Sequence, residues 1–233
     1  MRDLIARLFN LERHEAGAVI AGFGMFFLLF AGLFMLRPVR ETMGVAGGVD
    51  NLAWMFTATF VGMLVAMPVF GWVAARVARR RILYWVFGYV AATLLLFAAG
   101  MATSPQDPWM ARGFYVWYSV FNLLAISVAW SVLVDVFAIG QAKRLFALMA
   151  AGASLGGLCG PLLADRLVTP MGHAGLLALS ALCLVASALA ASRVQRWRDR
   201  HPLPADAEAP RQQPLGGNPF AGALDVLRSP YLM

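Results

Sequence analysis

The chain has little of what most enzymes use for chemistry. Its 233 residues include one lysine, three histidines and two cysteines, and only 13% of them are charged. The single lysine, Lys143, does not follow a glycine-rich loop of the kind that cradles phosphates in ATPases. The histidines at positions 14, 173 and 201 lack metal-ligand spacing, and no two acidic residues recur three or four apart within an apolar stretch. We therefore expect no enzyme activity, no metal and no cofactor.

The cysteines and the net charge add no further chemistry. Cys159 and Cys183 lie in apolar stretches without a neighbouring thiol or histidine cluster, so they are interpreted as small apolar core residues. The net charge of +7 could indicate nucleic-acid binding. The arginines, however, flank apolar stretches and do not form a basic groove with interleaved aromatic residues. Nucleic acid is therefore excluded as a partner.

What the chain has in abundance is apolar sequence. Hydrophobic residues make up 61% of it, and mean hydropathy is +0.70. Each long apolar stretch must be helical in hydrocarbon, where unpaired backbone groups find no partner. The sequence thus predicts an all-α, polytopic membrane protein with a six-helix transmembrane bundle in residues 16–195. Its six spans are 16–36, 52–75, 82–101, 113–134, 145–164 and 174–191.

The distribution of basic residues predicts the orientation in the membrane. With a cytoplasmic N-terminus, 13 arginines and lysines fall on the inner side of the six spans and four on the outer side. We therefore expect both ends to be cytoplasmic. The expected location is the cell membrane, as a multi-pass protein of the bacterial inner-membrane type, with the lipid bilayer as a partner.

The segments outside the bundle indicate how the chain is organised. Residues 1–15 place leucines at helical spacing among charges, which is typical of an interfacial amphipathic helix. Residues 196–219 are rich in proline and glycine and are interpreted as a flexible cytoplasmic linker. Residues 220–233 are half apolar, as at the start of a second half. The layout is typical of the first half of a transporter with two six-helix bundles, so a missing C-terminal half or a second copy is an expected partner.

Small residues line one face of the fifth predicted span. Gly152, Gly156 and Gly160 repeat every four residues, and Pro161 follows them. Such spacing lets two helices approach closely. Two interpretations stay open: static packing, or a sliding surface in which Pro161 loosens the helix where it bends.

Polar residues line one face of the fourth predicted span. Tyr115, Ser119 and Asn122 follow one another at steps of four and three residues. A buried amide such as Asn122 is costly in lipid unless it faces another helix or a water-filled cavity. Interhelical hydrogen bonding and cavity lining both explain this face. Tyr115 is also suited to be an interfacial anchor.

A charged cluster closes the first predicted span. Arg37, Arg40 and Glu41 surround Pro38 and Val39, on the side where positive charge is disfavoured. The arginines either snorkel to lipid headgroups or attract an anion, since guanidinium groups bind phosphate and carboxylate through paired hydrogen bonds. In the second case Glu41 would orient a guanidinium. These three residues, with Tyr115, Ser119 and Asn122, form the predicted substrate site.

Three segments resemble known transporters. The loop at 71–81, with Arg76, Arg79, Arg80 and Arg81, resembles the motif of the major facilitator superfamily, although Ala75 replaces its usual aspartate. Segments 36–41 and 141–146, the latter with Lys143 and Arg144, resemble those of ATP/ADP translocase-type nucleotide exchange transporters, a branch with the same architecture. The resemblance covers about residues 5–195, and the ending at 229–232 resembles the start of that family's second half.

This resemblance implies a secondary transporter that works by alternating access, with a cavity lined by spans one, two, four and five. The predicted substrate is a small organic anion, with nucleotide exchange by an antiporter as one form. The predicted gating residues are Arg76, Arg79, Asp135, Lys143 and Arg144. Asp135 either pairs with the basic loop when the cytoplasmic side closes, or is a solvated charge at a helix end. The alternatives are a noncatalytic membrane scaffold, an inactive half-transporter, and an exporter of drugs or metabolites.

Overall fold

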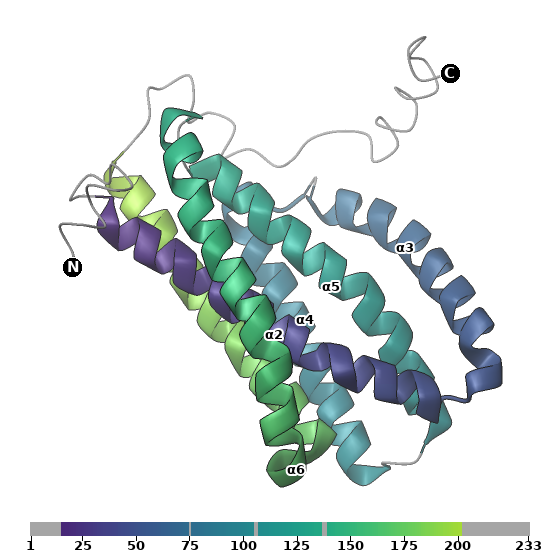
Figure 1. Cartoon of the computed structure of the whole chain (residues 1–233). Helices are drawn as coiled ribbons and strands as arrows, with labels where there is room; N and C mark the ends of the chain where they lie inside the picture. The colour runs from purple at the N-terminus through teal and green to yellow at the C-terminus, as the bar shows by residue number, and fades with distance from the viewer. Residues whose placement is uncertain (1–14, 75, 105–106, 137–138, 202–233) are drawn as a thin grey trace.

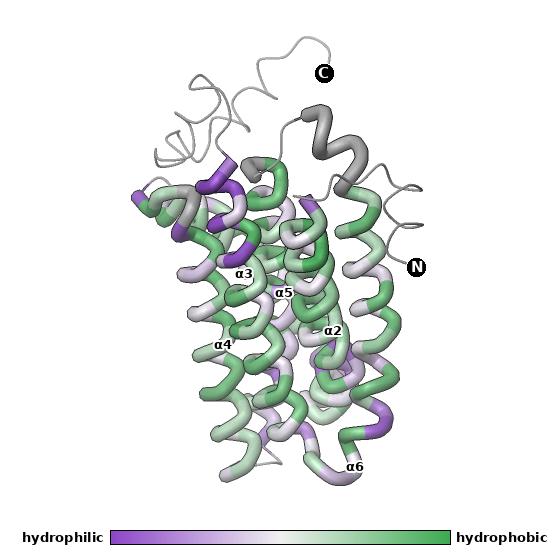
Figure 2. The backbone as a smooth tube through the Cα atoms, turned by 90° about the vertical axis from the view of Figure 1, so that its left-hand side faces the viewer, coloured by the Kyte–Doolittle hydropathy of each residue, from purple (hydrophilic) through white to green (hydrophobic). Residues whose placement is uncertain are grey.

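The computed structural model describes residues 15–74, 76–104, 107–136 and 139–201, and this part of the chain is helical (Figure 1). The elements are α2 (Ala16–Ala46), the short 3-10 helix η1 (Val49–Asn51), α3 (Leu52–Ala74), α4 (Arg79–Thr103), α5 (Pro108–Val136) and α6 (Ile139–Arg200). Hydrophobic residues run along the helices, and most strongly hydrophilic positions lie near their ends (Figure 2).

Five of these helices are long and apolar enough to cross a membrane, within the residues described. The sequence predicted six. The difference arises in α6, whose apolar part, Phe146–Arg200, contains both the fifth and the sixth predicted spans. The two are joined at Gly172, the one non-helical position inside α6, where φ is 66° and ψ is −178°. Helical geometry continues on both sides of this single glycine, so a kink at one residue separates the fifth and sixth predicted spans.

The two arms of α6 both pack against α2. Along the first arm, Met149 lies beside Gly22 and Gly160 beside Ala31, so this arm runs parallel to α2. Along the second arm, the hydroxyl of Ser180 donates to the carbonyl of Gly32, and that of Ser187 to Met25, so this arm runs antiparallel. The chain thus reverses at Gly172 and holds α2 between the arms (Figure 1).

The remaining helices complete one side of this core. α4 packs on the second arm of α6 and on α5, and the hydroxyl of Tyr84 donates to Gln195 of that arm at 3.0 Å. α5 contacts α2, α3 and α4. By contrast α3 packs mainly on α5 and lies at the edge of the bundle (Figure 1). Only Met55 and Ala74 of α3 are buried, and most of its other large apolar side chains are exposed.

Several predicted boundaries need correction. The first span was expected to end at residue 36, yet α2 continues to Ala46 with Pro38 inside it, so the charged cluster lies within a helix. The linker was predicted from residue 196, but α6 is helical to Arg200. There Gln195 and Arg198 are buried against the bundle, and this packing extends the helix into a polar sequence. The predicted interfacial segment (1–15, apart from Glu15), the rest of the linker and the segment 220–233 lie outside the described residues.

Candidate functional site

The charged cluster and the polar face of α5 meet at one guanidinium. Arg40 donates from Nε to Ser119 Oγ at 2.9 Å and from Nη2 to the hydroxyl of Tyr115 at 2.8 Å. Its Nη1 donates to Glu41 Oε1 at 2.6 Å, and this contact is also an ion pair between the two side chains. Arg40 is thus bound on three of its nitrogens, and such charge-assisted hydrogen bonds are stronger than neutral ones. The side chain is fixed between α2 and α5.

Tyr115 is the centre of this arrangement. It is 2% exposed, and the guanidinium carbon of Arg40 lies 4.2 Å from its ring centroid, within cation–π range. Its ring also meets Phe56 of α3 edge-on at 6.2 Å. Gly44, one turn after Arg40, makes room for the ring: a Cβ there would lie 3.0 Å from Tyr115 Cε2. Tyr115 therefore joins three helices, which is more than an interfacial anchor does.

Arg37 lies one turn before Arg40 on α2 and differs from it in exposure and in hydrogen bonding. Its side chain is exposed, and it makes no hydrogen bond or ion pair with any other described residue. Glu41 is paired with Arg40, so the three charges leave one positive charge, on Arg37. The structure thus separates two arginines that the sequence analysis treated as equivalent.

Asn122 extends the polar face toward the middle of α5. Its Oδ1 atom is buried, and it has no hydrogen-bond partner among the described residues. An unpaired buried acceptor costs about 1–3 kcal/mol. The interhelical hydrogen bond that was one interpretation of Asn122 is therefore not formed to this oxygen within the described part of the bundle.

The opposite face of the same α2 segment borders a cavity of about 240 Å³. Val39 and Thr42 line it from α2, and Asp165 and His173 from α6. No local pattern marks Asp165 or His173, because the reversal at Gly172 places both at this cavity. Arg40 points to α5, so the arginine cluster and this cavity lie on different faces of α2.

Most of the predicted gating residues have side chains that the structure does not describe. The side chains of Arg79, Asp135, Lys143 and Arg144 are not among those that the structure describes. Arg76 is exposed, donates to the carbonyl of Trp72 at 3.2 Å and stacks on its ring at 3.8 Å. The pairing of Arg76 or Arg79 with Asp135 stays a prediction.

The three glycines of the fifth predicted span face α2 backbone directly. A Cβ on Gly152 would lie 2.5 Å from the carbonyl oxygen of Phe23, and one on Gly160 would lie 2.7 Å from that of Ala31. Gly156 is equally close to the carbonyl of Phe27. Pro161 lies within α6 without interrupting it, and the break comes at Gly172. This glycine seam brings the two backbones together as small residues do between membrane helices.

Comparison with known proteins agrees with this architecture. The family model described as the Major Facilitator Superfamily matches residues 16–233. Neither a curated protein nor a solved structure gives a match. Since the family model covers nearly the whole chain, and the described part consists of packed, membrane-spanning-length helices, the protein is a multi-pass membrane protein that belongs to the Major Facilitator Superfamily.

Proposed function

We propose that the protein is a secondary transporter that moves a small organic anion across the membrane by alternating access. Membership of the family supports a transporter. The arginine cluster is the observation that supports an anionic substrate. Arg40 is bound by Tyr115, Ser119 and Glu41, whereas Arg37 has an exposed side chain. A fixed arginine beside an uncompensated one gives a positive site on a helix that is otherwise apolar.

The two arginines take different roles in this proposal. Arg37 binds the anion, because guanidinium groups match carboxylate and phosphate oxygens bidentately. Arg40 is a positioning residue: it joins α2 to α5 and contributes positive potential beside Arg37. Asn122 lies deeper on the same face of α5, and its Oδ1, which has no partner among the described residues, can accept a hydrogen bond from a hydroxyl or amino group of the substrate.

The proposed topology has six crossings with both ends in the cytoplasm. Each arm of α6 lies along α2, one parallel and one antiparallel, and this arrangement supports counting the arms as separate crossings. Labelling of single cysteines, in a variant that lacks Cys159 and Cys183, tests it. We expect reaction from outside at position 47 and none at 78 or 205, and the reverse pattern would contradict the orientation.

Nucleotides are the first anions to test. Segments 36–41 and 141–146 resemble nucleotide exchangers, and the first of them contains both arginines of the site. We therefore infer exchange of a nucleotide or a comparable organic phosphate as the specific activity, with a second half or a second copy of the chain completing the cavity.

The test is uptake and exchange of labelled nucleotides and other organic anions by the full-length carrier in liposomes. Arg37→Gln should raise KM most, and Arg37→Lys should raise it less, because lysine keeps the charge but loses the bidentate geometry. Arg40→Lys should lower transport together with stability, since it removes bonds to α5. Arg166→Gln is the matched control, because Arg166 is an exposed arginine assigned to the same side of the membrane.

Two results would contradict the proposal. Parent-like kinetics in Arg37→Gln would show that this arginine only contacts lipid headgroups. If the carrier transports cationic or neutral compounds and no anion, the proposed anionic substrate is wrong, and an exporter of drugs or metabolites is favoured.

A further inference from the structure

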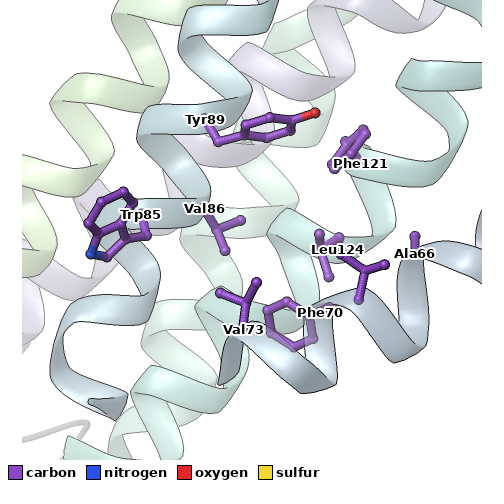
Figure 3. Close-up of a pocket in the computed structure, with 9 residues that line it drawn as sticks. Ala66, Phe70, Val73, Trp85, Val86, Tyr89, Phe121 and Leu124 are labelled. Atoms are coloured by element: carbon purple, nitrogen blue, oxygen red, sulfur yellow. The ribbon is translucent and has the colours of Figure 1, made fainter. Parts of the chain in front are cut away.

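An apolar groove lies on the side of the bundle where α3 diverges from α4. α3 supplies Val69, Phe70 and Val73, α4 supplies Trp85 and Tyr89, and α5 closes the floor with Phe121 (Figure 3). The cavity is about 340 Å³. Trp85 is 66% exposed and Tyr89 52% exposed, so the α4 wall is open to the surroundings of the bundle.

Positive charge gathers at one end of this groove. The α3 wall ends at Val73, one turn before Arg76, and Trp85 lies one turn after Arg81 on α4. Both arginines are exposed, and neither makes an ion pair with another described residue. Arg79 and Arg80 precede Arg81 in the first turn of α4, and the sequence has no aspartate or glutamate between residues 51 and 106.

Aromatic side chains lie beside these arginines at the end of the groove. Arg76 stacks on Trp72 at 3.8 Å, and Trp72 is 55% exposed. Exposed tryptophans beside arginines, here Trp72 on α3 and Trp85 on α4, are typical of the interface between hydrocarbon and headgroups. Clusters of basic residues at this level attract anionic headgroups.

We propose that this groove, with the arginines at its end, is a binding site for an anionic phospholipid. One acyl chain lies along Val69, Phe70 and Tyr89, and the phosphate lies between Arg76 and Arg81. An apolar protein segment would also fit the channel, but it would offer no negative charge to Arg76 and Arg81. The proposal goes beyond the proposed function and does not depend on the transported substrate.

Photolabelling in nanodiscs tests the proposal. The probe is phosphatidylglycerol with a diazirine in one acyl chain, compared with phosphatidylcholine that has the same chain, and adducts are mapped by mass spectrometry. We expect phosphatidylglycerol adducts in peptides covering 66–73 and 85–89. In the double variant Arg76→Gln with Arg81→Gln, labelling by phosphatidylglycerol should fall by about fivefold for each arginine lost. Labelling by phosphatidylcholine should stay unchanged.

Two further variants sharpen the test. Ala66→Trp fills the groove from α3 and should suppress labelling with both lipids. Arg193→Gln, Arg196→Gln is the matched loss of two exposed arginines on α6 and should leave labelling at the groove near the parent level.

Four outcomes would overturn the site. These are equal labelling by the two lipids, the same loss in the α6 control, displacement of the lipid by soluble glycerol phosphate, and adducts or cross-links that place a second protein segment in the groove.

Discussion

The close contact between the backbones of α6 and α2 gives a sharp test of the packing. Gly156 of the first α6 arm faces the carbonyl of Phe27, and a Cβ there would also lie 3.0 Å from the amide nitrogen of Ala31. Both obstacles are backbone atoms, which cannot rotate away as a side chain does. Gly156→Ala must therefore push α6 away from α2 along the whole glycine seam.

The size of the effect follows from two opposing contributions. Replacing glycine by alanine inside a helix stabilises it by about 0.5–1 kcal/mol. Overpacking a well-packed contact costs about 1–3 kcal/mol. The clash is with backbone, so the upper part of that range applies, and the net loss should be about 1–2 kcal/mol. For a chain of this size that lowers the melting temperature by about 2–8 °C.

Thermal unfolding of the purified protein in detergent measures this change, and the chain offers matched controls. Gly157 is the next residue of the same helix, yet its Cβ would lie 3.8 Å from Phe34, an ordinary contact. Gly88 has nothing within 4 Å. Gly157→Ala and Gly88→Ala should therefore keep or slightly raise the melting temperature. If Gly156→Ala melts with the parent, the backbones are not in contact at this point and the seam is wrong.

Three further changes address other parts of the bundle. Ser187→Ala removes a buried hydroxyl that donates to the Met25 carbonyl at 2.8 Å, and it should lower unfolding stability by about 0.6–1.7 kcal/mol. Ser127→Ala, at an exposed position, should have no effect. Gly172→Ala should lower the free energy of unfolding by about 1–3 kcal/mol, because φ of 66° with ψ of −178° is almost restricted to glycine. No atom lies within 4 Å of the position of its Cβ, so a clash would not contribute. An unchanged melting temperature would therefore refute backbone strain at Gly172. Tyr115→Phe removes the bond from Arg40 Nη2, while Ser119 and Glu41 still bind the other two nitrogens. It should loosen Arg40 and raise the KM for the anion without preventing membrane insertion, and unaltered kinetics would remove the Tyr115 hydroxyl from the site.

The helical nature of the chain and its place in the membrane were readable from the sequence. Long uncharged stretches allow only helices in hydrocarbon, whatever their neighbours. The glycine spacing predicted a close helix contact for the same local reason, because residues four apart share a face. The step from Tyr115 to Ser119 placed both on one face of α5, and the structure shows both bonded to Arg40.

Only the tertiary structure decided where the helices end and which partner each polar group has. Hydropathy placed the end of the first span before Arg37, but α2 continues because α5 binds Arg40 and keeps the charged turn helical. The difference between Arg37 and Arg40 likewise depends on which of them reaches α5, and both have the same local sequence chemistry. The open groove beside α3 arises from packing between distant segments, which no local pattern encodes.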